Sequence, residues 1–260
     1  MRGVDSVDDA ILRFDPITRE KESELRSPIK IASDDVHVWG FSLDVGGADL
    51  TAASHSLSRD EVERADRLVS ERNRRQFIAA HTGLRDILSR YCGRHPQELL
   101  FHRTAAGKPF LASETAIRFN LTHSHGRSLI AITSDREVGV DLEKLRPEVD
   151  VVSLAERFLS RRDQSFVQRG DPSRMHERFL QVWVAKEAFF KAEGKGITFP
   201  LHHDHVELSS DGTEARVIRE RSAPAVKMPI RFLSLEDGWI GAVAAEGTNW
   251  TVSYRSFRRS

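Results

Sequence analysis

Hydrophobic and polar residues alternate along several short stretches of the chain, and this period of two residues predicts β-strands with one buried face. Together with shorter apolar runs bounded by turn residues, the predicted strands are residues 36–43, 99–104, 117–124, 128–133, 138–144, 206–208, 215–218, 230–235, 239–244 and 250–257. Elsewhere apolar residues recur every three or four positions, which predicts helices. The predicted helices are residues 59–92, with a break near 70–73, and residues 151–159, 161–168 and 174–192.

The ends of the predicted helices carry residues that satisfy unpaired backbone groups. Ser58, followed three residues later by Glu61, forms a capping box, so a helix is expected to begin there. Gly93 and Gly194 are natural helix stops, because glycine readily adopts the left-handed conformation that ends many helices. Ser173 is expected to be the N-cap of the last predicted helix.

The predicted elements follow the same order twice, with a strand, then helical segments, then several strands. An α+β fold of two similar halves that meet near residue 137 accounts for this order. We expect a poorly ordered extension over residues 1–34, where charges are mixed and no period is sustained. The N-terminal half would then be residues 35–137 and the C-terminal half residues 138–260.

Two acidic residues share one face of the predicted strand over residues 138–144. A step of two residues places the carboxylates of Asp141 and Glu143 on the same side of the strand. At a separation of ~4 Å and an effective dielectric of ~20, two such charges repel by about 4 kcal/mol. The repulsion is relieved if water screens both groups, if one carboxyl is protonated, or if a cation lies between them. Oxygen ligands favour a hard ion such as Mg²⁺.

The last predicted helix places a lysine and a glutamate side by side. Lys186 falls within its apolar stripe, where an ammonium group is costly unless it is paired or directed outward. Glu187 and Lys191 are four residues apart and project together from the margin of that stripe. They are either an ordinary surface pair, or a third carboxylate for the site of Asp141 and Glu143 with a cation beside it for a phosphate.

The composition and net charge of the chain serve mainly to exclude classes of binding partner and cellular location. The chain of 260 residues has 39 basic and 39 acidic side chains, so no general attraction to nucleic acid or to a membrane surface is expected. No apolar run approaches the ~18 residues of a bilayer span, and there is no signal-peptide pattern. A single cysteine, Cys92, excludes an internal disulfide framework and fits a reducing compartment. We expect a cytoplasmic protein.

Four motifs taken together resemble those of a known enzyme family. In chain order they are Gly107-Lys108-Pro109, Phe119-Asn-Leu-Thr122-His123-Ser124, Gly139-Val-Asp141-Leu-Glu143-Lys144 and Trp183-Val-Ala-Lys186-Glu187-Ala-Phe-Phe-Lys191. Their order and spacing are similar to those of the 4′-phosphopantetheinyl transferases, in particular the monomeric, surfactin-synthetase type. The resemblance covers residues 36–200 and, more loosely, the C-terminal strands.

The resemblance implies a monomer of two pseudo-symmetric α+β halves, with coenzyme A and Mg²⁺ or Mn²⁺ bound between them. It implies that Asp141, Glu143 and Glu187 bind the metal together with the pyrophosphate of coenzyme A. Lys191 would pair with the same pyrophosphate. These expectations agree with the three converging carboxylates that the two motifs suggest by themselves.

The resemblance also implies a site for the phosphates of the 3′-phosphoadenosine end of coenzyme A. It assigns these phosphates to Lys108, Thr122 and His123, and to one arginine of the N-terminal half. Arg64 and Arg75 are the candidates for that arginine, and Arg75 is preferred because it lies in the Arg-Arg-Gln-Phe run beside the predicted helix break.

One departure from the family pattern follows the second motif. His125 stands between Ser124 and Gly126, whereas the family usually has glycine directly after the serine. The loop is therefore one residue longer, which changes its expected geometry and leaves the expected role of His123 unchanged.

These expectations describe the transfer of 4′-phosphopantetheine from coenzyme A to a serine of an acyl or peptidyl carrier protein, with release of 3′,5′-ADP. Glu187, or a metal-bound water that it orients, is the expected base for the serine proton. One alternative is a Mg²⁺-dependent phosphodiesterase or nuclease that uses Asp141 and the run Glu193-Gly-Lys195, although no broad basic stripe suits nucleic acid. The other is a catalytically inactive module that docks carrier proteins.

Overall fold

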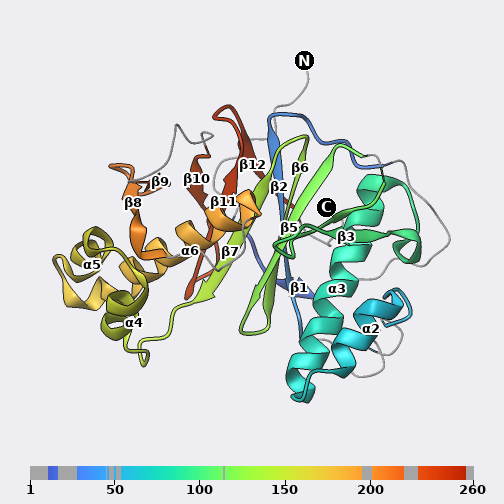
Figure 1. The fold of residues 1–260 in the computed structure, drawn as a ribbon, viewed down its shortest axis with the longest axis horizontal. Coiled ribbons are helices and arrows are strands. Elements are labelled where there is room, and N and C mark those ends of the chain that lie inside the picture. Colours follow the sequence, from blue (N-terminus) through green and yellow to red (C-terminus); the bar gives the residue numbers. More distant parts are fainter. Residues whose placement is uncertain are drawn as a thin grey trace.

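The computed structural model of the protein describes residues 11–16, 28–44, 46, 50, 54–113, 115–194, 201–219 and 228–255. Within these residues the strands form two five-stranded sheets and one two-stranded sheet, with helices on both sides (Figure 1). The order of elements confirms the expected α+β fold of two halves. None of the described helices combines the length and the apolar character that a bilayer span requires.

The first sheet has the strand order β1-β2-β6-β5, with β12 also beside β2. Its strands are β1 (Asp15–Pro16), β2 (Asp35–Ser42), β5 (Ile117–Ser124), β6 (Arg127–Ser134) and β12 (Thr251–Arg255). β6 lies antiparallel to both β2 and β5. A separate hairpin of β3 (Phe101–Arg103) and β4 (Pro109–Leu111) precedes β5 along the chain.

The second sheet has the strand order β7-β11-β10-β9-β8, and all neighbours are antiparallel. Its strands are β7 (Val138–Lys144), β8 (Asp204–Leu208), β9 (Glu214–Arg219), β10 (Ile230–Phe232) and β11 (Trp239–Ala245). β7 is an edge strand, and its free edge lies beside β5 of the first sheet. There the side-chain oxygen of Asn120 accepts a hydrogen bond from the Val140 amide at 2.9 Å, so a side chain replaces a backbone partner at the seam between the sheets.

Helices cover the outer face of each sheet, and the inner faces pack against each other. The helices are α2 (Arg59–Asp66), α3 (Glu71–Cys92), α4 (Val151–Phe158), α5 (Arg161–Gln168) and α6 (Met175–Glu193). Figure 1 shows α2 and α3 on one side of the molecule and α4, α5 and α6 on the other, with β2, β5, β6 and β7 between them. Trp39 and Phe41 of β2 pack toward α3, whereas Val36 and Val38 pack toward the second sheet.

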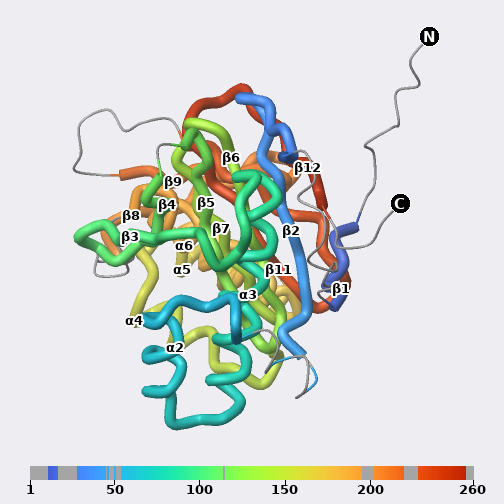
Figure 2. Tube along the Cα trace, turned by 90° about the vertical axis from the view of Figure 1, so that its right-hand side faces the viewer, coloured from blue at the N-terminus to red at the C-terminus, as the bar shows by residue number. Residues whose placement is uncertain are grey.

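Both ends of the described chain extend the first sheet in ways that the sequence analysis did not predict. Residues 11–16, expected to be loosely ordered, place Leu12 and Phe14 in the core between the sheets, and β1 pairs with β2. The last two predicted strands belong to different sheets, because β12 leaves β11 and pairs in parallel with β2 (Figure 2). Burial of Trp250 between the sheets favours this crossing. Residues 1–10 and 17–27 of the expected extension lie outside the described residues.

The predicted helix boundaries are mostly confirmed. The capping box at Ser58 is present, and both α3 and α6 end at a glycine in the left-handed conformation, Gly93 and Gly194. The predicted N-cap at Ser173 is wrong. Asp171 instead caps a short 3₁₀ turn that precedes α6, because its carboxylate accepts the amide hydrogen of Ser173.

A buried ion cluster holds α2 against α3. Glu61 of α2 is 7% exposed, accepts a hydrogen bond from Nε of Arg85 at 2.8 Å and lies 3.0 Å from Nδ1 of His81. Burial alone would raise the pKa of Glu61, but the hydrogen bonds from His81 and the Ser58 amide, with the charge of Arg85, lower it to about 2. Because this pKa lies below the ordinary carboxyl value, the ionised group stabilises the fold above about pH 4.5.

We expect Glu61→Gln to lower the free energy of unfolding by about 3 kcal/mol at pH 7, because the substitution leaves the buried Arg85 without its counter-charge. The difference from the parent protein should shrink as the pH falls from about 4.5 toward 2, where Glu61 itself becomes protonated. Urea unfolding at several pH values measures both effects. Glu63→Gln, on the exposed side of the same helix opposite Arg59, is the control and should change stability by under about 1 kcal/mol. Equal losses in the two variants would contradict this account.

Candidate active site

β7 directs its acidic residues toward α6. Its apolar residues lie in the core between the sheets, so the alternate residues face the opposite side. On that side a Cβ atom at Gly139 would lie 2.1 Å from the carbonyl oxygen of Ala188, which shows how closely α6 crosses the strand. Asp141 and Glu143 follow on the same face, as the sequence predicted, and they therefore open toward the C-terminal turns of α6.

α6 carries the third acidic residue and two lysines with different roles. Lys186 is fully buried, lies 2.6 Å from the carboxylate of Asp163 in α5, and donates to the carbonyl oxygen of Asp204 at 2.6 Å. This ion pair explains how an ammonium group is accommodated in the apolar stripe, and it fixes α6 against its neighbours. Glu187, 5% exposed, and Lys191 project on the side of β7.

Lys191 links the acidic face of β7 to β5. Its Nζ atom lies 2.5 Å from Oδ1 of Asp141 and donates to the hydroxyl of Thr122 at 3.1 Å. The hydroxyl of Thr122 in turn donates to the same Asp141 oxygen at 3.1 Å. Residues from both halves of the chain therefore hold the Asp141 carboxylate.

The three predicted carboxylates influence one another electrostatically. Burial, followed by the negative charges of Asp141 and Glu143, raises the pKa of Glu187 to about 7, although Lys191 acts in the opposite direction. Burial and the charge of Asp141 also raise the pKa of Glu143. Both pKa values are raised first by burial and then by the charge of Asp141, and the opposing charge of Lys191 does not cancel these two effects. The structure thus brings Asp141, Glu143, Glu187 and Lys191 into one electrostatic cluster.

The donor atoms of this cluster suit a hard divalent cation. Oδ2 of Asp141 is buried and has no hydrogen-bond partner, which is costly for a carboxylate oxygen unless a cation or proton satisfies it. All candidate ligands are oxygen atoms, the type that Mg²⁺ and Mn²⁺ prefer. In the described ranges no three Asp, Glu, His or Cys side chains are gathered tightly enough to enclose a metal, and Lys191 is the positive group beside Asp141.

β5 contributes a row of polar side chains to the same seam. Asn120, Thr122 and Ser124 occupy alternate positions and contact β7 in turn, at the Val140 amide, at Asp141 and at Glu143. The hydroxyl of Ser124 donates to Oε2 of Glu143 at 2.8 Å. Of these three residues, only Thr122 was predicted from the sequence to have a role in the site. The roles of Asn120 and Ser124 could have been predicted from the spacing, because small polar residues occur at every second position of a strand whose other residues are mostly apolar.

His123 points away from Thr122, as strand alternation requires, and lies on the side of the N-terminal half. Much of the residue is exposed to solvent. Even so, partial desolvation, followed by the positive charge of Lys191 and the influence of His81, lowers the pKa of His123. Its ring is therefore neutral near pH 7 and sits within electrostatic range of Lys191.

Lys108, which the family resemblance assigns to a phosphate, is hydrogen-bonded to protein oxygens in this structure. Its Nζ atom donates to Oε2 of Glu137 at 2.7 Å and to the carbonyl oxygens of Val138 and Ala192 at 3.1 and 3.0 Å. An ammonium group has three N–H donors, and these three contacts use all of them. In this arrangement Lys108 ties the β3–β4 turn to the start of β7 and the end of α6, and it has no donor left for a phosphate.

Arg64, one of the two arginine candidates for a phosphate, has a partly desolvated guanidinium group. Nη1 of Arg64 is buried without a hydrogen-bond partner, and its guanidinium lies 5.3 Å from the ring centre of Phe77. Desolvation, followed by the positive charge of Arg103, lowers the pKa of Arg64, although the negative charge of Glu61 acts in the opposite direction. A desolvated donor with another arginine nearby is suited to an anion. These features support Arg64 as a candidate for the phosphate in addition to Arg75, the residue that the sequence pattern favours.

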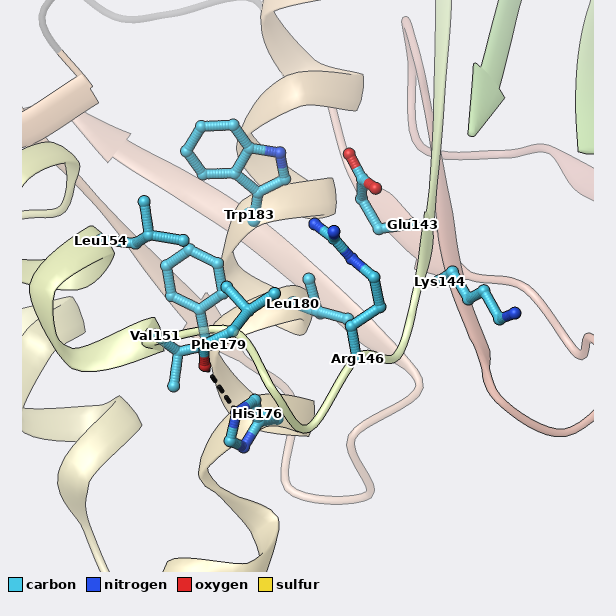
Figure 3. A pocket seen from close by; sticks show the side chains of 10 residues that line it. Glu143, Lys144, Arg146, Val151, Leu154, His176, Phe179, Leu180 and Trp183 are labelled. Atoms are coloured by element: carbon cyan, nitrogen blue, oxygen red, sulfur yellow. Dashed lines mark hydrogen bonds between the residues drawn. The ribbon is translucent and has the colours of Figure 1, made fainter. Parts of the chain in front are cut away.

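A pocket of about 180 Å³ opens beside Glu143, and most of its wall is apolar. It lies between the end of β7 and helices α4 and α6, and its lining includes Glu143, Arg146, Leu154, Phe179 and Trp183. Figure 3 shows the Arg146 side chain reaching toward Glu143, with Leu154 and Trp183 across the pocket. The carboxylate cluster therefore adjoins a space that can hold an uncharged chain of atoms.

Comparisons with known proteins point to one family. Two family models match adjacent parts of the chain: "4′-phosphopantetheinyl transferase, N-terminal" over residues 46–137, and "4′-phosphopantetheinyl transferase superfamily" over residues 137–241. The chain is 34% identical to 4′-phosphopantetheinyl transferase HetI of Nostoc sp., over 87% of this chain and 94% of that protein. It is 26% identical to 4′-phosphopantetheinyl transferase Sfp of Bacillus subtilis, over 73% of this chain and 82% of that protein.

Proposed function

Because this chain belongs to the 4′-phosphopantetheinyl transferase superfamily, we propose that the seam of β5, β7 and α6 is its active site. The protein is an enzyme that transfers the 4′-phosphopantetheine group from coenzyme A to a serine of a carrier protein. Phosphodiester hydrolysis and a purely docking role, the two alternatives raised by the sequence, are not favoured.

The observation that supports this assignment best is the electrostatic influence of Asp141, Glu143 and Glu187 on one another across β7 and α6, with Lys191 in contact with Asp141. We assign a Mg²⁺ ion, with Mn²⁺ as a substitute, to the three carboxylates. When bound, the ion supplies positive charge that polarises the pyrophosphate of coenzyme A and stabilises the departing 3′,5′-ADP. The unpartnered Oδ2 of Asp141 is the atom most in need of such charge.

Glu187 and Lys191 have separate tasks in this proposal. A carboxylate oxygen of Glu187, or a water that it orients, takes the proton of the carrier serine, because this buried carboxylate lies beside Asp141 and Glu143, where the pyrophosphate would lie. Nζ of Lys191, which contacts Asp141, offsets the negative charge that the pyrophosphate brings to the site. Neither task requires a group from outside this chain other than the metal, water and the substrates.

Coenzyme A would lie across the seam with its charged end on the N-terminal half. Arg64 would bind the 3′-phosphate together with His123, which faces the N-terminal half, and Thr122, on the opposite face of β5, would contact the phosphates nearer the metal. The pantetheine arm would enter the apolar pocket beside Glu143. This orientation places the pyrophosphate, where the bond breaks, next to the carboxylate cluster.

The assignment of Arg64 predicts that its replacement weakens the binding of coenzyme A only when the 3′-phosphate is present. We expect Arg64→Met to raise the KM for coenzyme A by about 10- to 100-fold, the value of one charge-assisted contact, with little effect on the KM for 3′-dephospho-coenzyme A. Arg59→Met, on the exposed side of the same helix, is the control and should change neither value. If Arg75→Met shows the phosphate-dependent loss and Arg64→Met does not, the 3′-phosphate belongs to Arg75.

The activity itself is tested by mass spectrometry of apo acyl and peptidyl carrier proteins incubated with the enzyme, coenzyme A and Mg²⁺. The carrier serine should gain the phosphopantetheine mass, and a chelator should prevent the gain. A panel of carriers from fatty-acid, polyketide and nonribosomal peptide systems would also identify the class that is served. Failure to modify any carrier would contradict the proposed site.

We also propose that the enzyme acts as a cytoplasmic monomer, without nucleic acid or membrane partners. One chain supplies the groups on both sides of the seam, with Thr122 from the N-terminal half and Asp141, Glu187 and Lys191 from the C-terminal half. Size-exclusion chromatography with light scattering tests the monomer.

A further inference from the structure

The turn between β5 and β6 has an unusual residue at its first position. Ser124 and Arg127 are paired, so His125 and Gly126 form a two-residue loop, and both have positive φ, at 45° and 81°. Asparagine, aspartate or glycine is favoured at the first position of such turns. Histidine tolerates a positive φ better than most residues do, but relative to glycine it still costs about 1 kcal/mol there. Because such a backbone conformation is often retained for a functional contact, the contacts of the His125 ring are of interest.

The ring of His125 is the outer member of a hydrogen-bonded chain that ends on Glu143. Nδ1 of His125 lies 2.9 Å from Oγ of Ser124, and that hydroxyl donates its single hydrogen to Oε2 of Glu143 at 2.8 Å. Because the serine hydrogen is used in that bond, the serine oxygen is the acceptor toward His125. The ring must then carry its hydrogen on Nδ1.

The charges around the ring agree with a neutral Nδ1–H form. Desolvation, followed by the positive charges of Arg146, Lys144 and Arg72, lowers the pKa of His125, with Glu148 opposing weakly. The residue is exposed, so its ring fills no space in the core. The unfavourable backbone conformation of His125 thus allows its ring to make the hydrogen bond to Ser124.

We propose that His125 is a positioning residue for the metal site: it orients the Ser124 hydroxyl so that this hydroxyl holds Glu143 in place for the cation. The proposal rests on the assignment of Glu143 as a metal ligand. Partners that orient a metal ligand without touching the metal commonly change metal affinity by about 10- to 100-fold. The same His125–Ser124–Glu143 chain fixes the carboxylate at the mouth of the apolar pocket.

The test uses Mn²⁺ as the probe, with binding followed by electron paramagnetic resonance in the presence of coenzyme A and without a carrier protein. We expect His125→Gly to weaken Mn²⁺ binding about tenfold or more, while its melting temperature is equal or higher because glycine relieves the positive φ. If His125 had only a structural role, its replacement would not weaken Mn²⁺ binding while leaving the melting temperature equal or higher. Asp135→Gly relieves the other positive φ of a non-glycine residue in the described chain and should leave Mn²⁺ binding unchanged.

A double-mutant cycle tests whether His125 acts through Ser124. Ser124→Ala should weaken Mn²⁺ binding, and adding His125→Gly to it should cause no further loss. Unchanged Mn²⁺ binding in His125→Gly, or additive losses in the double variant, would overturn the proposal while leaving the assigned site intact. If the parent protein itself binds no Mn²⁺ with coenzyme A present, the metal site fails and this inference fails with it.

Discussion

Glu187→Gln is expected to reduce the rate of phosphopantetheine transfer by about 10³-fold or more. Glutamine has nearly the same shape but cannot accept the serine proton, and general base catalysis alone contributes about 10² to 10⁴. The substitution also removes one of the three carboxylates assigned to the metal, so the two losses act on the same step. Single-turnover transfer to an apo carrier, followed by mass spectrometry, measures the rate.

The fold should tolerate this substitution well. The pKa of Glu187 is raised to about 7, so its ionised form is disfavoured by burial and by Asp141 and Glu143. A folded-state pKa above the ordinary value means that the ionised carboxylate destabilises the fold increasingly as the pH rises from about 4.5 to 7. The neutral glutamine avoids this penalty, so the melting temperature at pH 8 should be equal to or higher than that of the parent protein.

The matched control for this variant lies on the same helix. Glu177→Gln makes the same chemical change at the exposed start of α6, where Glu177 pairs with Arg174. It should leave the transfer rate within about twofold of the parent rate, because exposed pairs contribute little. If Glu187→Gln retains more than about a tenth of the parent rate, Glu187 is not the base.

Local sequence patterns predicted the acidic side of the site well. Alternation along β7 determines which way Asp141 and Glu143 face, and helical spacing places Glu187 and Lys191 together, so both follow from backbone geometry. The capping box at Ser58 is equally local, since its two hydrogen bonds join residues three positions apart. Such local features can be predicted without knowing which strands are neighbours in the sheet.

The contacts across the seam could not be predicted in the same way. The bonds of Ser124 to Glu143, and of Lys108 to Glu137 and Ala192, depend on how β5, β7 and α6 come together. The family resemblance gave Lys108 a phosphate, whereas its three hydrogen bonds in the fold are all to protein oxygens. The position of β12 also depends on the long-range burial of Trp250 between the sheets.

The closeness of β7 and α6 leads to the second large effect, at a residue that carries no functional group. Gly139→Ala is expected to destabilise the fold by about 3 kcal/mol or more and to reduce transfer by about 10²-fold. The added Cβ would lie 2.1 Å from the Ala188 carbonyl oxygen and 2.3 Å from the Ala192 amide nitrogen. Both contacts are with helix backbone, which cannot rotate away as a side chain could, so α6 must move off the strand.

Movement of α6 affects activity because the same helix turns carry Glu187 and Lys191. A displacement of about 1 Å between them and Asp141 is enough to cost about 10²-fold in rate when reacting groups must be aligned. Gly170→Ala is the control for the added methyl group, since nothing lies within 4 Å of its Cβ and only its positive φ of 74° is penalised. It should lose about 1 kcal/mol of stability and no activity. Chemical denaturation measures the stability, and the carrier assay measures the activity. If Gly139→Ala is as active as Gly170→Ala, β7 and α6 are not in the close contact on which the site depends.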